Sequence, residues 1–140
     1  MKIAIYGREF NDSVLPFVQQ VFNALSLYKI EIVVYSKFHN FIKDKVTLPT
    51  NTTTFSGHKD LLAKGDVLLS LGGDGTLLDT LSLVRDSQIP VIGINFGRLG
   101  FLASINKNEI DTAIDALVKG EYSLDKRGIL SLESKSNLFD

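Results

Sequence analysis

Four short apolar runs predict the strands of a sheet. They lie at residues 2–6, 31–35, 66–71 and 90–95 of the 140-residue chain. The first run is partly β-branched and ends at Gly7, which is the pattern of a buried strand. Near the end of the chain, residues 128–133 begin to alternate in polarity as a half-exposed strand does.

In the first half of the chain, the residues between the strands favour helices. Asp12 or Ser13 is expected to cap the first helix, and Pro16 stands in its first turn, where a missing N–H matters little. The pattern over residues 38–46 is weaker and predicts a short helix. Residues 47–56 are rich in threonine and are expected to be irregular, with at most a short edge strand. The apolar stripe of the first helix is Val14, Phe17, Val18, Val21, Phe22 and Leu25.

Two more helices are predicted in the second half, over residues 75–85 and after Asn106. Asn106 is expected to cap the later one, because Glu109 three residues on completes a variant of the capping box. Gly120 should end it. The predicted apolar faces are Leu77, Leu78, Leu81 and Val84 in the earlier helix, and Ile110, Ala113, Ile114 and Leu117 in the later one.

The alternation of strands and helices predicts an α/β fold: a Rossmann-like, open, mostly parallel sheet with helices on both faces. We expect an α/β nucleotide-binding domain over residues 1–125. The strands at 67–71 and 91–95 should be neighbours or nearly so, since each ends in a glycine cluster. In open sheets of this kind, ligands gather where the carboxyl ends of such strands meet.

Composition and charge narrow the range of partners. The formal net charge is -1, with no long run of either sign, which argues against a large basic face for nucleic acid or membrane. The chain has no cysteine, which excludes a disulfide framework, a thiolate zinc site and a cysteine nucleophile. The first apolar run is too short for a signal peptide and no later run is long enough to span a bilayer. We therefore expect a cytoplasmic protein.

The densest glycine cluster is Gly72-Gly73-Asp74-Gly75-Thr76, between a predicted strand and a predicted helix. Glycine lets the backbone turn with positive φ and approach a phosphate, and the unpaired N–H groups of a helix start favour an anion. Asp74 suits another task, because a carboxylate repels phosphate but can accept a hydroxyl proton or hold a divalent metal. The loop thus indicates phosphoryl transfer to an alcohol. A tight turn with Asp74 as a helix cap is the alternative interpretation.

A second glycine cluster, Gly-Ile-Asn-Phe-Gly-Arg-Leu-Gly-Phe-Leu, spans residues 93–102. Asn95 offers a donor and an acceptor, and Arg98 can pair with phosphate. Phe101 can stack on a base, although core packing is the more frequent role of a lone phenylalanine.

The two clusters together, at this separation, strongly resemble the NAD kinases. Those enzymes pass the γ-phosphoryl of ATP, or in some members polyphosphate, to the 2′-hydroxyl of the adenosine ribose of NAD and so form NADP. The first cluster alone also resembles diacylglycerol and sphingosine-type lipid kinases, which usually continue with Asn-Glu where this chain has Leu78-Asp79. The resemblance implies Mg²⁺ with ATP, NAD as the substrate and a parent protein that is a homo-oligomer.

The resemblance also implies roles for single residues. Asp74 would accept the proton of the 2′-hydroxyl, and Gly75 would contact the dinucleotide. The remaining expected contacts are Gly72, Gly73 and Thr76 beside the triphosphate, Phe101 and Leu102 at the adenosine, and Asn95, Gly97 and Arg98 on the phosphate side.

The family pattern includes a second, mostly β domain that supplies an Asn-Glu or Asn-Asp pair and most of the NAD pocket. Residues 126–140 are therefore interpreted as the start of a connection to a C-terminal domain that is not in this chain, and the chain alone is expected to be inactive. A lipid kinase domain and a non-catalytic nucleotide-binding regulatory module remain the alternatives, because fold alone does not separate them. Asp79 is interpreted as a solvated or capping-network residue, and His39 and His58 as surface residues.

Overall fold

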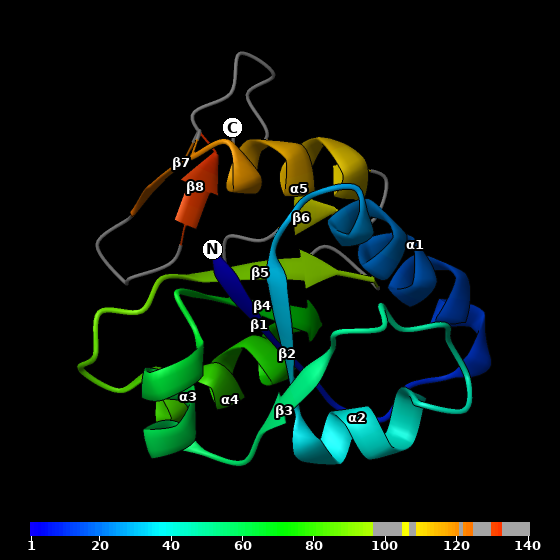
Figure 1. Ribbon diagram of the computed structural model, residues 1–140, viewed down its shortest axis with the longest axis horizontal. Coiled ribbons are helices and arrows are strands. Elements are labelled where there is room, and N and C mark those ends of the chain that lie inside the picture. Colours follow the sequence, from blue (N-terminus) through cyan, green and yellow to red (C-terminus); the bar gives the residue numbers. More distant parts are fainter. Residues whose placement is uncertain (97–104, 107–108, 121, 125–129, 133–140) are drawn as a thin grey trace.

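A parallel sheet forms the centre of the molecule (Figure 1). The computed structural model describes residues 1–96, 105–106, 109–120, 122–124 and 130–132. Six strands follow the order β3-β2-β1-β4-β5-β6, and every neighbouring pair is parallel. They are β1 (Lys2–Gly7), β2 (Glu31–Tyr35), β3 (Thr53–Phe55), β4 (Val67–Gly72), β5 (Val91–Asn95) and β6 (Ile105–Asn106).

Helices cover both faces of this sheet, as the sequence predicts (Figure 1). The helices α1 and α5 pack with α2 on one face, where the larger apolar cluster lies, and α3 and α4 cover the other. Their bounds are η1 (Asp12–Val14, a 3₁₀ turn), α1 (Leu15–Ser26), α2 (Ser36–Ile42), α3 (His58–Lys64), α4 (Asp74–Val84) and α5 (Ile110–Val118). Fully buried Ile3, Ile5 and Leu69 join the core on the first face, whereas Ala4 and Leu68 point to the second.

The predicted helix starts are wrong at two places. Asp12 and Ser13 do not cap α1, because they form the 3₁₀ turn and α1 begins only at Leu15, with Pro16 in its first turn as expected. Asn106 does not cap α5 either, since it lies in β6 and the helix begins at Ile110.

The predicted apolar face of α4 is also partly wrong. Leu77 and Val84 are buried, but Leu78 and Leu81 keep 53% and 47% of their surface exposed. Thr80 takes a place on the buried side instead, where its hydroxyl donates to the carbonyl of Leu77 at 2.5 Å. A buried hydroxyl that bonds within its own helix leaves no polar group unsatisfied, so helical spacing of leucines alone misplaces the face.

The end of the described chain forms a hairpin. Strands β7 (Tyr122–Leu124) and β8 (Leu130–Leu132) pair antiparallel, so the predicted strand near residue 130 is present, with a partner that the sequence did not indicate. Before them, Gly120 ends α5 as predicted: its φ is +76°, and its N–H donates to the carbonyl of Leu117 at 3.2 Å.

Candidate functional site

The glycine loop occupies the junction between β4 and α4. The strand ends at Gly72, Gly73 is the N-cap residue, and Asp74 is the first residue of the helix. Gly72 has a φ of +153°, and a β-carbon there would lie 2.5 Å from Oγ1 of Thr76. Position 72 therefore requires glycine for two reasons, its backbone conformation and the close approach of the buried Thr76 side chain.

The second strand that carries predicted site residues lies beside this loop. Strands β4 and β5 are hydrogen-bonded neighbours, and Asn95 is the register partner of Gly72. Asn95 is 8% exposed. The prediction that the two strand ends share one edge is confirmed as far as Asn95. The remaining predicted residues of the second cluster, Gly97, Arg98, Phe101 and Leu102, lie outside the described residues.

The carboxyl end of β1 brings three side chains that the sequence did not single out as site residues. Asp79, in α4, accepts from Arg8 Nε at 2.5 Å and from Arg8 Nη2 at 2.7 Å. Its Oδ2 also accepts from the Tyr6 hydroxyl at 2.8 Å. We call Tyr6, Arg8 and Asp79 the loop cluster. The sequence interpretation of Asp79 as a solvated or capping-network residue does not describe these contacts, because its partners lie 71 and 73 residues away and it caps none of the described helices.

The loop cluster lies against the glycine loop. Gly7 at the end of β1 pairs with Leu71, so the next residue along, Arg8, reaches the level of the loop. Nη1 of Arg8 passes over Gly75, where a β-carbon would be only 3.2 Å from it. The only sequence signal for this arrangement is the position of Arg8 directly after a strand end.

The ionisation of the loop cluster follows from these contacts. Burial, and next the hydrogen bond to Asp79, raise the pKa of Tyr6 from 10.0 to about 12. The hydrogen bonds from Arg8 lower the pKa of Asp79, and the same contacts raise the pKa of Arg8. The three groups are thus held as a neutral phenol, a carboxylate and a guanidinium.

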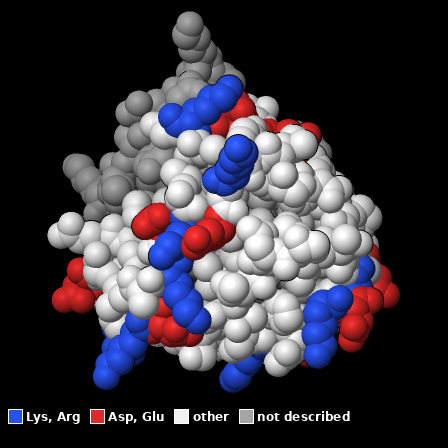
Figure 2. Space-filling model, in the orientation of Figure 1, with Lys and Arg blue, Asp and Glu red and all other residues white. Residues whose placement is uncertain are grey.

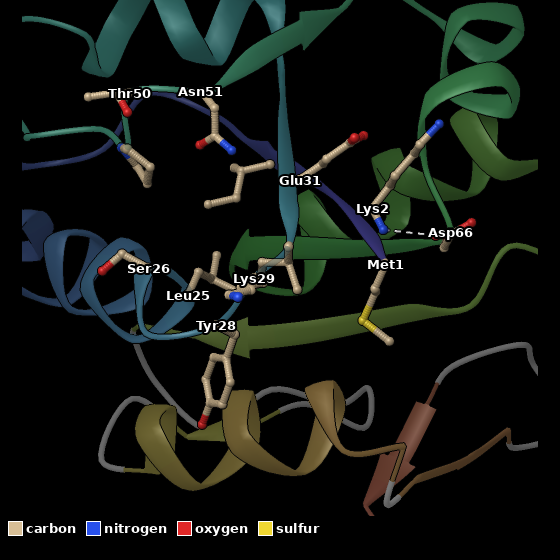
Figure 3. Close-up of a pocket in the computed structure, with 13 residues that line it drawn as sticks. Met1, Lys2, Leu25, Ser26, Tyr28, Lys29, Glu31, Thr50, Asn51 and Asp66 are labelled. Atoms are coloured by element: carbon tan, nitrogen blue, oxygen red, sulfur yellow. Dashed lines mark hydrogen bonds between the residues drawn. The ribbon is translucent and has the colours of Figure 1, made fainter.

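A second cluster joins the same kinds of group at the other end of the sheet. Asp115 of α5 accepts from the Tyr28 hydroxyl at 2.7 Å and lies 3.0 Å from Nζ of Lys119. We call Tyr28, Asp115 and Lys119 the helix cluster. Tyr28 comes shortly before β2 begins, and Figure 3 shows its hydroxyl directed toward α5.

A hollow of about 820 Å³ lies beside the helix cluster, at the amino ends of the strands (Figure 3). Lys2 and Glu31, the first residues of β1 and β2, line it, and the N–H of Lys2 donates to Asp66 at 2.8 Å. It contains none of the predicted site residues. Parallel sheets bind their ligands at the opposite, carboxyl ends of the strands, so we place the candidate site at the glycine loop.

Charges elsewhere are mixed. Figure 2 shows acidic and basic side chains interspersed on the face in view, without a large patch of one sign. Within the described ranges, no three histidine or acidic side chains gather closely enough to hold a metal ion. His58 Nδ1 lies 2.5 Å from the carbonyl of Leu83, so it has a partner inside the domain.

Comparison with known proteins identifies the family of the chain. The family model of the ATP-NAD kinase N-terminal domain matches residues 3–122, which include the glycine loop, β5 and the predicted second cluster. The chain belongs to this family. The matched residues include both glycine clusters, whose separation was part of the resemblance.

Individual relatives carry the NAD kinase name. The NAD kinase of Flavobacterium psychrophilum is 38% identical over 138 residues, 99% of this chain and 47% of the relative. The NAD kinase of Cytophaga hutchinsonii is 38% identical over 140 residues, 99% of this chain and 48% of the relative. The chain therefore spans about half the length of these NAD kinases.

A solved structure supports the fold. The crystal structure of yeast NADH kinase complexed with NADH matches 84% of this chain and 35% of its own, with a TM-score of 0.71 and 20% identity. In the part of this NAD kinase family domain that the structure describes, no helix combines the length and apolar character needed to cross a membrane.

Proposed function

We propose that this chain is the N-terminal domain of an NAD kinase, and that the complete protein transfers a phosphoryl group to the 2′-hydroxyl of the adenosine ribose of NAD. The observation that carries the proposal is the junction of β4 and α4. There the glycine loop presents Asp74 at a helix start, two residues after Gly72, which pairs with Asn95 of the neighbouring strand.

The geometry supports different roles for the backbone of the loop and for the side chain of Asp74. Backbone N–H groups at the start of α4 have no partner within the helix and favour the phosphates of the donor. Asp74 carries a carboxylate at the same helix start, suited to accept the proton of the attacking 2′-hydroxyl. In the proposed step the bond from the ribose oxygen to the γ-phosphorus forms. The bond from that phosphorus to the bridging oxygen breaks, and ADP leaves.

The preferred donor is proposed to be ATP as its magnesium complex, with polyphosphate as the alternative. Magnesium enters sites of this kind through one or two carboxylates together with the phosphates of the substrate. No three histidine or acidic side chains among the described residues gather to hold a metal ion, so we propose that the ion arrives with the phosphates of the donor.

The other points about the function of the complete protein stay predictions. We propose that residues 1–125 form the nucleotide-binding domain and that residues 126–140 lead to a second domain, in line with relatives about twice as long. The same proposal includes contacts with the substrates from Gly97, Arg98, Phe101 and Leu102. A homo-oligomeric parent and a cytoplasmic location also stay predictions.

Membership in the NAD kinase family favours this proposal over a lipid kinase domain. The regulatory module with Asp74 as a structural cap is separated from it by experiment. In the full-length protein, Asp74→Asn should keep the fold and much of the nucleotide affinity. It should lower the rate of NADP formation by about 10²- to 10⁴-fold, the usual loss on removal of a general base.

A matched control is Asp86→Asn, which removes one exposed carboxylate just after α4. It should leave the rate unchanged. The assay is NADP formation with ATP and a magnesium salt. Activity of Asp74→Asn within about twofold of the parent would reduce Asp74 to a cap and support the regulatory module.

A further inference from the structure

The side chain of Arg8 is oriented mainly by Asp79, a residue distant from it in sequence. Its guanidinium meets Asp79 through two parallel N–H···O contacts, at 2.5 and 2.7 Å. Tyr6 donates to the same carboxylate. A bidentate contact of this kind fixes the plane of a guanidinium as well as its position.

The two contacts to Asp79 engage Nε and Nη2, so neither of them uses the two N–H groups of Nη1. A guanidinium has five N–H groups and no acceptor, so unused donors that face a loop favour an anion. Nη1 lies over Gly75, at the start of α4, where the backbone can be approached because there is no β-carbon. The side chain of Arg8 is 53% exposed, so an incoming ligand can reach it.

A merely structural ion pair is the competing explanation. Exposed pairs contribute little to stability, and many contribute nothing measurable. The contact joins residues 71 positions apart in sequence, at the edge of the sheet where ligands of this fold gather. That position, together with the Nη1 donors that the contacts to Asp79 do not use, argues for a role in binding.

We propose that Arg8 binds a phosphate group of one of the two substrates through Nη1, and that Asp79 and Tyr6 are positioning residues that hold its guanidinium over Gly75. The proposal rests on the proposed function for the identity of the substrates, and the shared chemistry is a phosphate oxyanion. Two sources are possible at this place, the polyphosphate chain of the donor and the pyrophosphate of the dinucleotide.

The test compares Arg8→Met, Arg8→Lys and Lys119→Met in the full-length protein. Methionine keeps much of the apolar stem of either basic residue and removes the charge. Lys119 pairs with an aspartate at the far end of the sheet and serves as the matched control. Urea unfolding of each variant shows that it folds.

Steady-state NADP formation is measured against ATP and against NAD. Arg8→Met should raise the KM of one substrate by about 10-fold or more, the usual effect of losing a charge-assisted hydrogen bond, with a smaller change in kcat. Arg8→Lys should recover part of the loss, and Lys119→Met should stay within about twofold of the parent. A KM that rises for ATP identifies the donor phosphates, and one that rises for NAD identifies the pyrophosphate. If Arg8→Met leaves both KM values within twofold, the proposal is wrong.

A direct binding measurement separates this proposal from the proposed function. Inorganic triphosphate and NAD are titrated calorimetrically into the parent and into Arg8→Met. If the protein forms no NADP but binds either ligand at least about 10-fold more weakly after Arg8→Met, the kinase assignment fails and the role of Arg8 stands. Binding that is absent from the parent, or unaffected by Arg8→Met, overturns the role of Arg8.

Discussion

The loop cluster and the helix cluster are built from the same kinds of group at opposite ends and on opposite faces of the sheet. Each joins a tyrosine hydroxyl and a basic side chain to one aspartate, at 2.5 to 3.0 Å. One lies at the carboxyl ends of the strands beside α4, and the other at the amino ends beside α5. Their difference lies in how each aspartate obtains its cation.

In the helix cluster the ion pair is a product of the helix itself. Asp115 and Lys119 are four residues apart in or next to α5, and any helix brings such residues together. In the loop cluster, Arg8 and Asp79 meet only when α4 has packed on the sheet beside β1. A contact that needs the finished fold, and lies at the ligand-binding edge, points more strongly to function than one that local structure produces.

The tyrosines differ as well. For Tyr6, burial is the main reason that its pKa is raised, with the bond to Asp79 second. For Tyr28, the hydrogen bond to Asp115 is the main cause. Tyr6 also contacts the ring of Tyr35 at 5.1 Å between centroids, so it belongs partly to the core.

The largest expected contrast comes from one glycine beside each cluster. Gly75→Ala places a β-carbon 3.2 Å from Nη1 of Arg8, so the guanidinium must shift by a few tenths of an ångström. We expect NADP formation by the full-length protein to fall by up to about 10-fold, the limit set by full loss of a charge-assisted contact. The free energy of unfolding should be unchanged or slightly higher, because alanine favours a helix over glycine by up to about 1 kcal/mol.

Gly120→Ala should behave in the opposite way. Its φ of +76° strains any residue with a β-carbon, so the free energy of unfolding should fall by about 1 kcal/mol. The turnover should stay unchanged. Urea unfolding and the NADP assay on both variants check the pair. A Gly75→Ala protein with full activity, or a Gly120→Ala protein that loses activity at full stability, would break the comparison.

The fold shows which elements the local sequence pattern predicts and which it does not. The four strands follow from apolar runs, since a buried strand needs little beyond them. The short edge strand allowed for within residues 47–56 is present as β3. Short elements such as β6 and α3 (His58–Lys64) are stabilised by packing on neighbours, and local pattern does not reveal that. The same applies to the start of α1, where a 3₁₀ turn replaced the predicted cap, and to the exposed Leu78.

The candidate site likewise has one part that the sequence predicts and another that it does not. The glycine loop is local in sequence, so the motif alone predicts Gly72 and Asp74 at a strand-to-helix junction, as the structure has them. The adjacency of Asn95 follows once β4 and β5 are assumed to be neighbours. Arg8 could not be found in this way, because its partner is 71 residues distant and neither residue belongs to a recognised motif.

The next contrast is expected at alkaline pH. The pKa of Tyr6 is raised to about 12 in the folded protein from 10.0, so the neutral phenol is the form that the fold favours. Its contribution to stability is fully present below about pH 10 and is lost as the pH rises toward 12. The free energy of unfolding of Tyr6→Phe should therefore fall less steeply over this range than that of the parent.

Phenolate absorbance provides the second readout. The chain has four tyrosines, and Tyr6→Phe should remove a transition from the upper end of the titration. Tyr28→Phe, the control from the helix cluster, should leave that transition in place. A parent whose tyrosines all ionise together near pH 10 would contradict the burial of the Tyr6 hydroxyl.

The smallest contrast is expected at acid pH. The pKa values of Asp79 and Asp115 are both lowered, Asp79 chiefly by Arg8 and Asp115 chiefly by Tyr28. A lowered pKa gives a contribution to stability that is present above the unfolded-state pKa, near 3.8, and is lost as the pH falls through the folded-state pKa. Asp79→Asn and Asp115→Asn should each reduce the loss of stability of the parent below about pH 4. The effect should be modest, because water and salt screen both pairs. We expect the larger reduction in Asp79→Asn, since Arg8 binds Asp79 through two N–H groups whereas Lys119 is a single ammonium.

Urea unfolding from pH 5 to 2 at two salt concentrations measures this loss of stability in each variant. Asp44→Asn is the control for loss of one exposed charge outside both clusters. Equal slopes for Asp79→Asn and Asp44→Asn would mean that Arg8 does not hold Asp79 in solution, and the loop cluster would then be no more fixed than any surface charge.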